Sequence, residues 1–302
     1  MGYGALALAA ASLEVPAAAT LKLKDPKQYR YIGKNDTFLT DGKAIATGTA
    51  QFGIDMRLPG MVHAVVARPP VLGGQVKSFD ASDALKVPGV LKVFALEGTP
   101  PPSEFQPIGG IVVVAKDTWA AVKGRSLLKI EWNDGAHGSY DSDSFRKELE
   151  AAVSKPGGKE VRNEGDVYAA LAVAAKRIEA NYYVPHYAHA AMEPPVAPAR
   201  ISGGKCEVSA PSQSPQAAVD RLAKRLNLSP ENITVHVTLL GGGLGRKSKC
   251  DFVLESALAS KALGGTPAAR SRRGCTAARS PPSSPSLRPT PSTSRPSNSV
   301  LA

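Results

Sequence analysis

Residues 240–247 read Leu-Gly-Gly-Gly-Leu-Gly-Arg-Lys, and this glycine loop joins a strand-like run to a helix-like one. Residues 233–239 alternate apolar and polar side chains as a half-buried strand does, whereas residues 251–263 carry apolar side chains at helical spacing. Glycine removes the Cβ atoms that keep a ligand away from the backbone, and a loop that enters a helix N-terminus offers unpaired N–H groups. The sequence therefore predicts a loop whose backbone approaches a ligand closely.

The two common nucleotide-binding motifs do not fit this loop. A P-loop needs Gly-Lys followed by Ser or Thr, but Arg246 separates Gly245 from Lys247. A dinucleotide fingerprint needs a third glycine three residues after its second, and that position after Gly245 holds Ser248. Taken alone, the loop is equally well explained as a glycine-rich turn between a strand and a helix.

Two further segments precede the loop and change this interpretation. Residues 211–216 read Pro-Ser-Gln-Ser-Pro-Gln before a predicted helix over 216–226, and residues 185–194 read Pro-His-Tyr-Ala-His-Ala-Ala-Met-Glu-Pro. In this order the pieces resemble the molybdopterin-binding subunit of the xanthine dehydrogenase and aldehyde oxidase family. Gln213 takes the place of that family's glutamine and residues 241–245 that of its Gly-Gly-Gly-Phe-Gly loop, with Leu244 replacing Phe. Residues 189–194 take the place of its His-x-x-Met-Glu-Pro element.

The resemblance extends toward the N-terminus and covers roughly Tyr3 to Gly265. Residues 47–55, 58–61, 76–80 and 87–90 are similar to successive landmarks of the family's α/β hammerhead domain. The Gly-Arg-Lys that follows the glycine run is most similar to the large subunit of the isoquinoline 1-oxidoreductase type. The stretch 1–19 resembles an internal helix of the family, which implies that further sequence precedes it in a complete protein.

The resemblance implies a molybdenum-pterin cofactor in the complete protein, with hydroxylation of an aldehyde or N-heterocyclic small molecule as the reaction. The expected cofactor-binding residues are Gln213, Gly241, Gly242, Gly243, Leu244 and Gly245. No protein metal ligand is expected, because the pterin dithiolene holds the metal in this family. The base is a glutamate near the family's C-terminus, beyond this chain, and an iron–sulfur small subunit is the expected electron-accepting partner. We therefore expect a fragment that is inactive alone.

Two other classes of function fit part of the pattern. One is a noncatalytic binding or scaffold module that keeps the hammerhead surface, and the other is a phosphate-binding protein that uses the glycine loop. Individual residues also have plain structural explanations. Gln213 could brace the turn before its helix, His186 and His189 are too few for a zinc site and are expected to pack or hydrogen-bond, and Glu193 is expected to be a buried brace.

The expected fold class is α/β (α+β), a hammerhead domain followed by the first part of a molybdopterin-binding domain. The predicted segments are an N-terminal extension (1–39), the hammerhead-like domain (40–135), a linker helix (136–163), the partial molybdopterin-binding domain (164–265) and a disordered tail (266–302). Strands are predicted over 61–68, 90–96, 111–115, 127–132 and 233–239, with a hairpin over 196–201 and 206–210. Helices are predicted over 82–86, 117–125, from 141 to about 154, 166–175, 216–226 and 251–263.

The positive charge of the chain is mainly a property of the predicted tail. The formal net charge is +11, and the arginines of residues 266–302 supply +6 of it without any Lys, Asp or Glu. A segment of Ser, Pro, Thr and Arg buries too little apolar surface to offset its ordering entropy. Elsewhere acids and bases are interspersed without an aromatic-lined basic stripe, so specific nucleic-acid binding is not expected.

Membrane insertion and cysteine chemistry are not indicated either. No apolar run reaches the roughly 18 residues that span a bilayer, and the Ala-rich residues 1–19 lack the basic start of a secretory signal, which leaves a cytoplasmic or periplasmic protein. Cys206, Cys250 and Cys275 show no paired spacing, so neither a disulfide framework nor an iron–sulfur cluster is supported.

Overall fold

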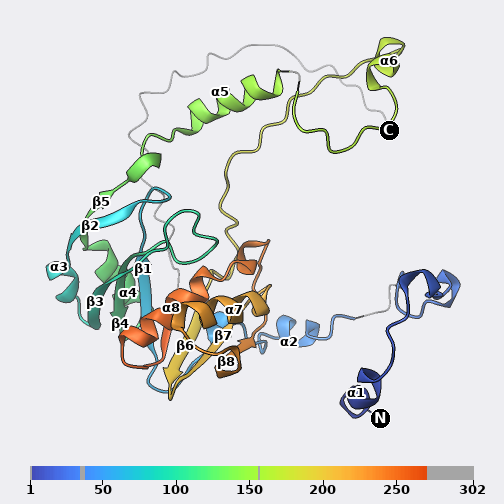
Figure 1. Ribbon diagram of the computed structural model, residues 1–302. Coiled ribbons are helices and arrows are strands. Elements are labelled where there is room, and N and C mark those ends of the chain that lie inside the picture. Colours follow the sequence, from blue (N-terminus) through green and yellow to red (C-terminus); the bar gives the residue numbers. More distant parts are fainter. Residues whose placement is uncertain (1, 35–37, 156, 271–302) are drawn as a thin grey trace. The chain divides into compact units, whose positions relative to one another are not determined.

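The computed structural model describes residues 2–34, 38–155 and 157–270, and the chain divides into two compact units, Met1–Ala50 and Gln51–Ala302 (Figure 1). The first unit contains helices α1 (Tyr3–Ala11) and α2 (Gly42–Ala46) and the short 3-10 turns Ala18–Thr20 and Pro26–Gln28. None of its described residues is buried. The helix expected within residues 1–19 is present as α1, which ends at Ala11.

The second unit is built on a mixed seven-stranded sheet in the order β3-β4-β1-β9-β6-β7-β8. These strands are β1 (Val62–Ala67), β3 (Val90–Leu96), β4 (Gly110–Ala115), β6 (Ala197–Ser202), β7 (Lys205–Ala210), β8 (Ile233–Val237) and β9 (Ala268–Arg270). β1 pairs with β9 and β7 with β8 in parallel, while the other pairs are antiparallel. A separate two-stranded sheet pairs β2 (Gln75–Asp80) with β5 (Lys129–Asn133).

The helices of this unit follow the predicted order, with some shorter than expected. They are α3 (Ser82–Leu85), α4 (Thr118–Ser126), α5 (Ser142–Val153), α6 (Val167–Ala172), α7 (Pro215–Leu226) and α8 (Asp251–Ala262), with 3-10 turns at Gly53–Asp55, Gly135–His137, Pro230–Asn232 and Arg246–Ser248. Asp117, Asp141 and Asp166 cap α4, α5 and α6 by accepting a backbone N–H in the first turn. Residues 177–184 form no regular element.

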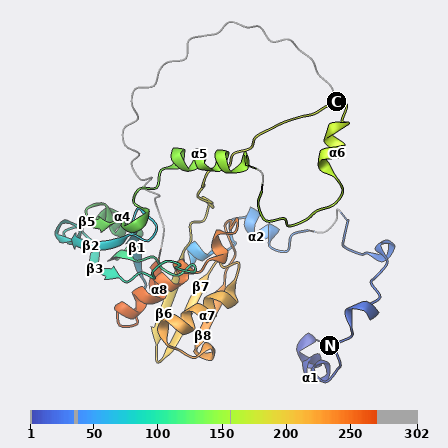
Figure 2. The same ribbon diagram turned by 45° about the horizontal axis from the view of Figure 1, so that its top comes forward.

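Opposite faces of β1 and β4 pack against different helices. Val65 and Val113 pack with Ala121 of α4, whereas their neighbours along the strands, including Ala64 and Val112, pack with Ala259 of α8. Since successive side chains of a strand point to opposite faces, both faces of this part of the sheet are covered. Figures 1 and 2 show strands that are far apart in the sequence, β1 and β6, in one sheet beside α8.

Helix α8 also holds the sheet together through hydroxyl groups. Ser256 Oγ donates to the carbonyl oxygens of Ala197 and Ala268, each at 2.6 Å, and Ser260 Oγ accepts from Ile201 N at 3.1 Å. These bonds satisfy buried polar groups on β6 and β9 as well as the serines themselves. A helix with polar side chains at these positions is therefore stable in a buried site.

The predicted tail begins too early. Residues 266–270 are ordered, because Ala268–Arg270 form β9 between β1 and β6, and Pro267 O accepts from Val62 N at 2.9 Å. Two neighbouring strands supply the hydrogen bonds that the local composition does not predict. Residues 271–302 lie outside the described part of the chain. The domain boundaries near residues 135 and 164 stay a prediction, and one sheet runs through both segments.

His63 on β1 provides a titratable probe of the packing between β1 and α4. Its Nδ1 lies 3.0 Å from Thr118 Oγ1, and burial together with the nearby Arg57 lowers the pKa of this imidazole from its ordinary 6.5. His63 therefore binds a proton more readily in the unfolded chain than in the folded one. As the pH falls through 6.5, protonation of His63 in the unfolded chain lowers the free energy of unfolding.

We therefore expect His63→Gln to reduce the loss of unfolding free energy on going from about pH 7.5 to about pH 5.5. Urea unfolding at the two pH values measures this loss in each protein. Equal losses in His63→Gln and in the unsubstituted chain would show that His63 does not titrate differently in the folded state.

Candidate functional site

The glycine loop follows β8 and adopts backbone conformations that favour glycine. The φ angles are +93° at Gly242, +52° at Leu244 and +86° at Gly245. Leu244 is unusual among these residues, because residues other than glycine seldom adopt a positive φ angle. Its side chain is 71% exposed. Strain of this kind concentrates at binding sites, where the surrounding structure maintains it.

Gln213 lies directly against this loop. Its Oε1 accepts from Gly245 N at 3.1 Å, and its backbone N donates to Lys247 O at 3.1 Å. A Cβ atom built on Gly243 would lie 2.6 Å from Gln213 Oε1. The missing side chain at position 243 therefore makes room for the glutamine amide.

Several donors of this site have no partner within the described part of the chain. The backbone N–H groups of Gly242, Gly243 and Leu244 make no hydrogen bond there, and neither does Gln213 Nε2. Gly242 and Leu244 are exposed, and so is Gln213. Three adjacent backbone donors, two of them on glycines without a Cβ atom, lie next to a side-chain amide and fit a ligand that is rich in acceptor atoms and bound close to the main chain.

Glu193 is a buried brace for the same loop. Its carboxylate accepts from Gly241 N at 2.9 Å, from Ile54 N at 2.9 Å and from Lys247 Nζ at 2.5 Å. Its backbone N also donates to Gly241 O at 2.8 Å. The expectation of a structural role for Glu193 thus agrees with its contacts, and the pairing with a buried lysine is a feature that the sequence did not predict.

The helix that follows the loop does not offer its N-terminus to a ligand. The turn Arg246–Ser248 separates the loop from α8, and Asp251 occupies the first helical turn. Arg246 makes a bidentate ion pair with Asp251, with N–O distances of 2.8 and 2.7 Å. Because of the intervening turn, the expectation that the loop runs directly into a helix N-terminus is wrong. An anion at this helix end would also meet the carboxylate of Asp251. The N-terminus of α8 therefore gives the phosphate-binding alternative no support.

The histidines form no metal site with their neighbours. His186 stacks on Phe145 with ring centroids 5.8 Å apart, and His189 Nε2 lies 4.0 Å from a Cβ built on Gly245. Among the described residues, no three His, Cys, Asp or Glu side chains come together in a way that could hold a metal ion. The stacking of His186 agrees with the predicted packing role, whereas His189 is exposed and its role stays a prediction.

The buried cysteines are not poised to bind metal either. Burial raises the pKa of the Cys206 thiol to about 11, and burial likewise raises that of Cys250. Because the thiolate is the metal ligand and the nucleophile, both side chains stay protonated near neutral pH. Cys275 lies outside the described residues.

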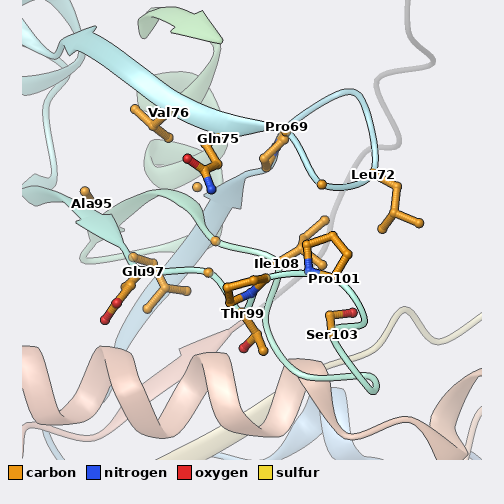
Figure 3. Close-up of a pocket in the computed structure, with 17 residues that line it drawn as sticks. Pro69, Leu72, Gln75, Val76, Ala95, Glu97, Thr99, Pro101, Ser103 and Ile108 are labelled. Carbon is orange, nitrogen blue, oxygen red and sulfur yellow. The ribbon is translucent and has the colours of Figure 1, made fainter. Parts of the chain in front are cut away.

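A small cavity adjoins the loop, and a larger one lies elsewhere. The first has a volume of about 190 Å³ and is lined by residues 188–191, Pro194, Pro195, Arg246 and Lys247. This volume is below the roughly 300–1,000 Å³ typical of small-molecule pockets. The larger cavity, of about 500 Å³, is lined by residues around Gln75 and Thr99, with glycines and prolines making up about half of the lining (Figure 3). Glu97 is the one ionisable side chain among its described lining residues, and Gln75, Thr99 and Ser103 supply its other polar side chains.

Comparison with protein families identifies the domain that contains this loop. Residues 152–272 match the family model of the molybdopterin cofactor-binding domain. The matched range includes Gln213, the glycine loop and Glu193, and no comparison supports the scaffold or phosphate-binding alternatives.

Two curated relatives align with most of the chain. The membrane-bound aldehyde dehydrogenase (pyrroloquinoline-quinone) of Gluconacetobacter polyoxogenes is 32% identical over 252 residues, which are 82% of this chain and 32% of that protein. The isoquinoline 1-oxidoreductase beta chain of Brevundimonas diminuta is 29% identical over 261 residues, covering 83% of this chain and 32% of that protein. The chain thus spans about a third of the length of these relatives.

Solved structures show the same fold and confirm the predicted mixed α/β class. Quinoline 2-oxidoreductase from Pseudomonas putida 86 superposes with a TM-score of 0.56 at 20% identity, covering 78% of this chain and 34% of that one. Aldehyde oxidoreductase from Desulfovibrio gigas superposes with a TM-score of 0.53 at 21% identity, covering 77% and 29%. Among the helices of the described residues, none is both long and apolar enough to cross a bilayer.

Proposed function

Because this chain belongs to the family of molybdopterin-binding large subunits of molybdenum hydroxylases, we propose that its glycine loop and Gln213 form one wall of the pocket for the molybdenum-pterin cofactor. One observation carries the proposal: the N–H groups of Gly242, Gly243 and Leu244 have no partner within the described residues and lie beside the amide of Gln213. An acceptor-rich ligand satisfies such donors, and glycine permits the close approach.

Each part of the site has a distinct task in this proposal. The loop donates backbone hydrogen bonds to the cofactor, and Gln213 donates through Nε2 while its Oε1 stays bonded to Gly245 N. Glu193 and Lys247 lie behind the loop and keep its position. The cofactor, when bound, supplies the two-electron redox chemistry of the hydroxylation, and the protein supplies binding and orientation.

We further propose that the complete protein oxidises aldehydes or N-heterocycles and transfers electrons through an iron–sulfur subunit. Relatives named as subunits support a multi-subunit assembly: the molybdenum-binding subunits of aldehyde oxidoreductase and of xanthine dehydrogenase, both from Escherichia coli. Residues 40–135 are proposed as the hammerhead-like domain and 164–265 as part of the cofactor domain. The small cavity at the loop supports the expectation that this chain alone shows no turnover.

A chimera tests the proposal in a complete pocket. The aligned part of this chain would replace the matching segment of the Brevundimonas isoquinoline 1-oxidoreductase subunit beta, and molybdenum, pterin and pyrroloquinoline quinone would be measured in the purified protein. We expect molybdenum and pterin in equal amounts without quinone. A folded chimera that contains quinone, or neither group, would contradict the proposal.

Variants of the chimera test the assigned residues. Gly243→Val places a branched side chain against Gln213 Oε1 and is expected to weaken cofactor retention at least ~10-fold, or about 1.4 kcal/mol. Gln213→Ala should leave folding intact and lower turnover. Leu244→Phe, which introduces the residue of the family pattern, is the matched control and should retain the cofactor. Equal cofactor content in Gly243→Val and the control would remove the loop from the site.

A further inference from the structure

Glu193 and Lys247 form an ion pair that is almost completely removed from solvent. The side chains are 4% and 0% exposed, and Lys247 Nζ lies 2.5 Å from Glu193 Oε2. Lysine and glutamate are seldom fully buried, and a buried pair adds little net stability compared with apolar side chains of similar volume. A role in fixing geometry would account for such a pair better than a role in stability.

The contacts of the pair connect segments that are distant in the sequence. Glu193 holds Ile54 N of the turn Gly53–Asp55 and Gly241 N of the glycine loop, which are 139 and 48 residues away along the chain. Lys247 continues the connection, because its carbonyl oxygen accepts from Gln213 N at 3.1 Å. A continuous series of contacts therefore leads from Ile54 through the ion pair to Gln213.

The loop itself is fitted closely to this pair. A Cβ atom on Gly241 would lie 2.5 Å from Glu193 Cβ, so the two segments touch at the backbone. Gln213 receives its fixed position from the same loop, through Lys247 O and Gly245 N. A shift of the lysine side chain would consequently move the backbone that orients Gln213.

We propose that Glu193 and Lys247 are a positioning pair, which sets the place of the glycine loop and of Gln213 relative to the turn at Ile54. The inference deepens the proposed function, since Gln213 and the loop are the residues assigned to the cofactor. Neither Glu193 nor Lys247 has to touch the cofactor. The pair acts through the backbone that it holds.

Amide hydrogen exchange of the full chain, without any cofactor, tests this inference. Lys247→Met removes the ammonium group but keeps the backbone carbonyl that accepts from Gln213 N. We expect the amides of Gln213 and Gly241 to exchange at least ~10-fold faster, because local opening of the loop becomes easier. Leu222→Ala, in the core formed with α8, is the control: it lowers stability but should leave exchange by local opening unchanged.

The double variant Glu193→Gln, Lys247→Met separates positioning from stability. It removes both charges, so its urea midpoint should recover toward that of the unsubstituted chain while the Gln213 amide still exchanges fast. If Lys247→Met does not fold, amide exchange at Gln213 in the double variant tests the positioning role instead. Unchanged Gln213 exchange in a folded variant, or equal acceleration in Leu222→Ala, would overturn the inference. Absence of cofactor from the chimera would instead contradict the proposed function and leave this result intact.

Discussion

Gly241→Ala is expected to lower the free energy of unfolding by about 3–5 kcal/mol, a large effect for one methyl group. The new Cβ would lie 2.5 Å from Glu193 Cβ, an atom close to the backbone that cannot rotate away. Glu193 would have to move, which opens its buried pair with Lys247 and its bonds to Ile54 N and Gly241 N. Urea unfolding, monitored by tryptophan fluorescence, measures the free energy of unfolding of the variant and of the unsubstituted chain.

Gly243→Ala is the matched control for this prediction. Its Cβ would meet the tip of the Gln213 side chain, with Oε1 at 2.6 Å, and the flexible end of a side chain moves aside cheaply. We expect a loss below about 1 kcal/mol, in the range of substitutions outside the core. Similar losses at positions 241 and 243 would mean that Glu193 does not confine the loop.

Arg68→Met is expected to cost about 3–5 kcal/mol of unfolding free energy, because it removes the cation that pairs with the fully buried Glu255 carboxylate. Arg68 lies at the end of β1, and its Nε donates to Glu255 Oε1 of α8 at 2.9 Å. Its NH2 donates to the same oxygen and to Asp251. Burial opposes the charge of the guanidinium, but the attraction of Glu255 and Asp251 outweighs it and raises the pKa of Arg68.

The control for this prediction is the double variant Arg68→Met, Glu255→Leu, which replaces the charges by apolar side chains. Such replacements are often close to neutral, so the double variant should recover most of the lost stability. Unfolding free energies of the single and double variants provide the comparison. A loss under about 1 kcal/mol in Arg68→Met would indicate that the pair behaves like an exposed one.

Local sequence patterns predict most of the secondary structure around the site. The hairpin of β6 and β7 follows from alternating side chains on either side of Gly203 and Gly204, both of which have positive φ angles. The cap residues Asp117, Asp141 and Asp166 stand directly before the first residue of their helices. These signals lie within a few residues of the element that they specify.

Amino-acid composition fails to predict the strand β9. Ala268–Arg270 belong to a segment whose Ser, Pro and Arg content predicts disorder, yet they pair with Val62–Ala64 on one side and Ala197–Ala199 on the other. Alanine has little preference for strands, so the pairing partners decide the conformation. Those partners lie far away in the sequence and leave no local sign.

In the site, too, contacts between segments that are distant in the sequence cannot be predicted from local patterns. The contact between Gln213 and the glycine loop agrees with the order of the segments, and the role of both in cofactor binding stays a prediction. The burial of Lys247 was not predicted, because lysine is nearly always exposed and its partner Glu193 is 54 residues away. The Arg68–Glu255 pair spans 187 residues and is equally invisible to local patterns.

Protection of the loop amides by the cofactor tests the central claim most directly. Hydrogen exchange would be compared between the chimera with its molybdenum-pterin cofactor and the same protein prepared without it, at the amides of Gly242, Gly243 and Leu244. We expect exchange at these residues to slow at least ~10-fold in the loaded protein, since donors that have no partner among the described residues then gain one. Equal exchange rates in the two preparations, with the cofactor present, would contradict the assignment of this loop to the cofactor pocket.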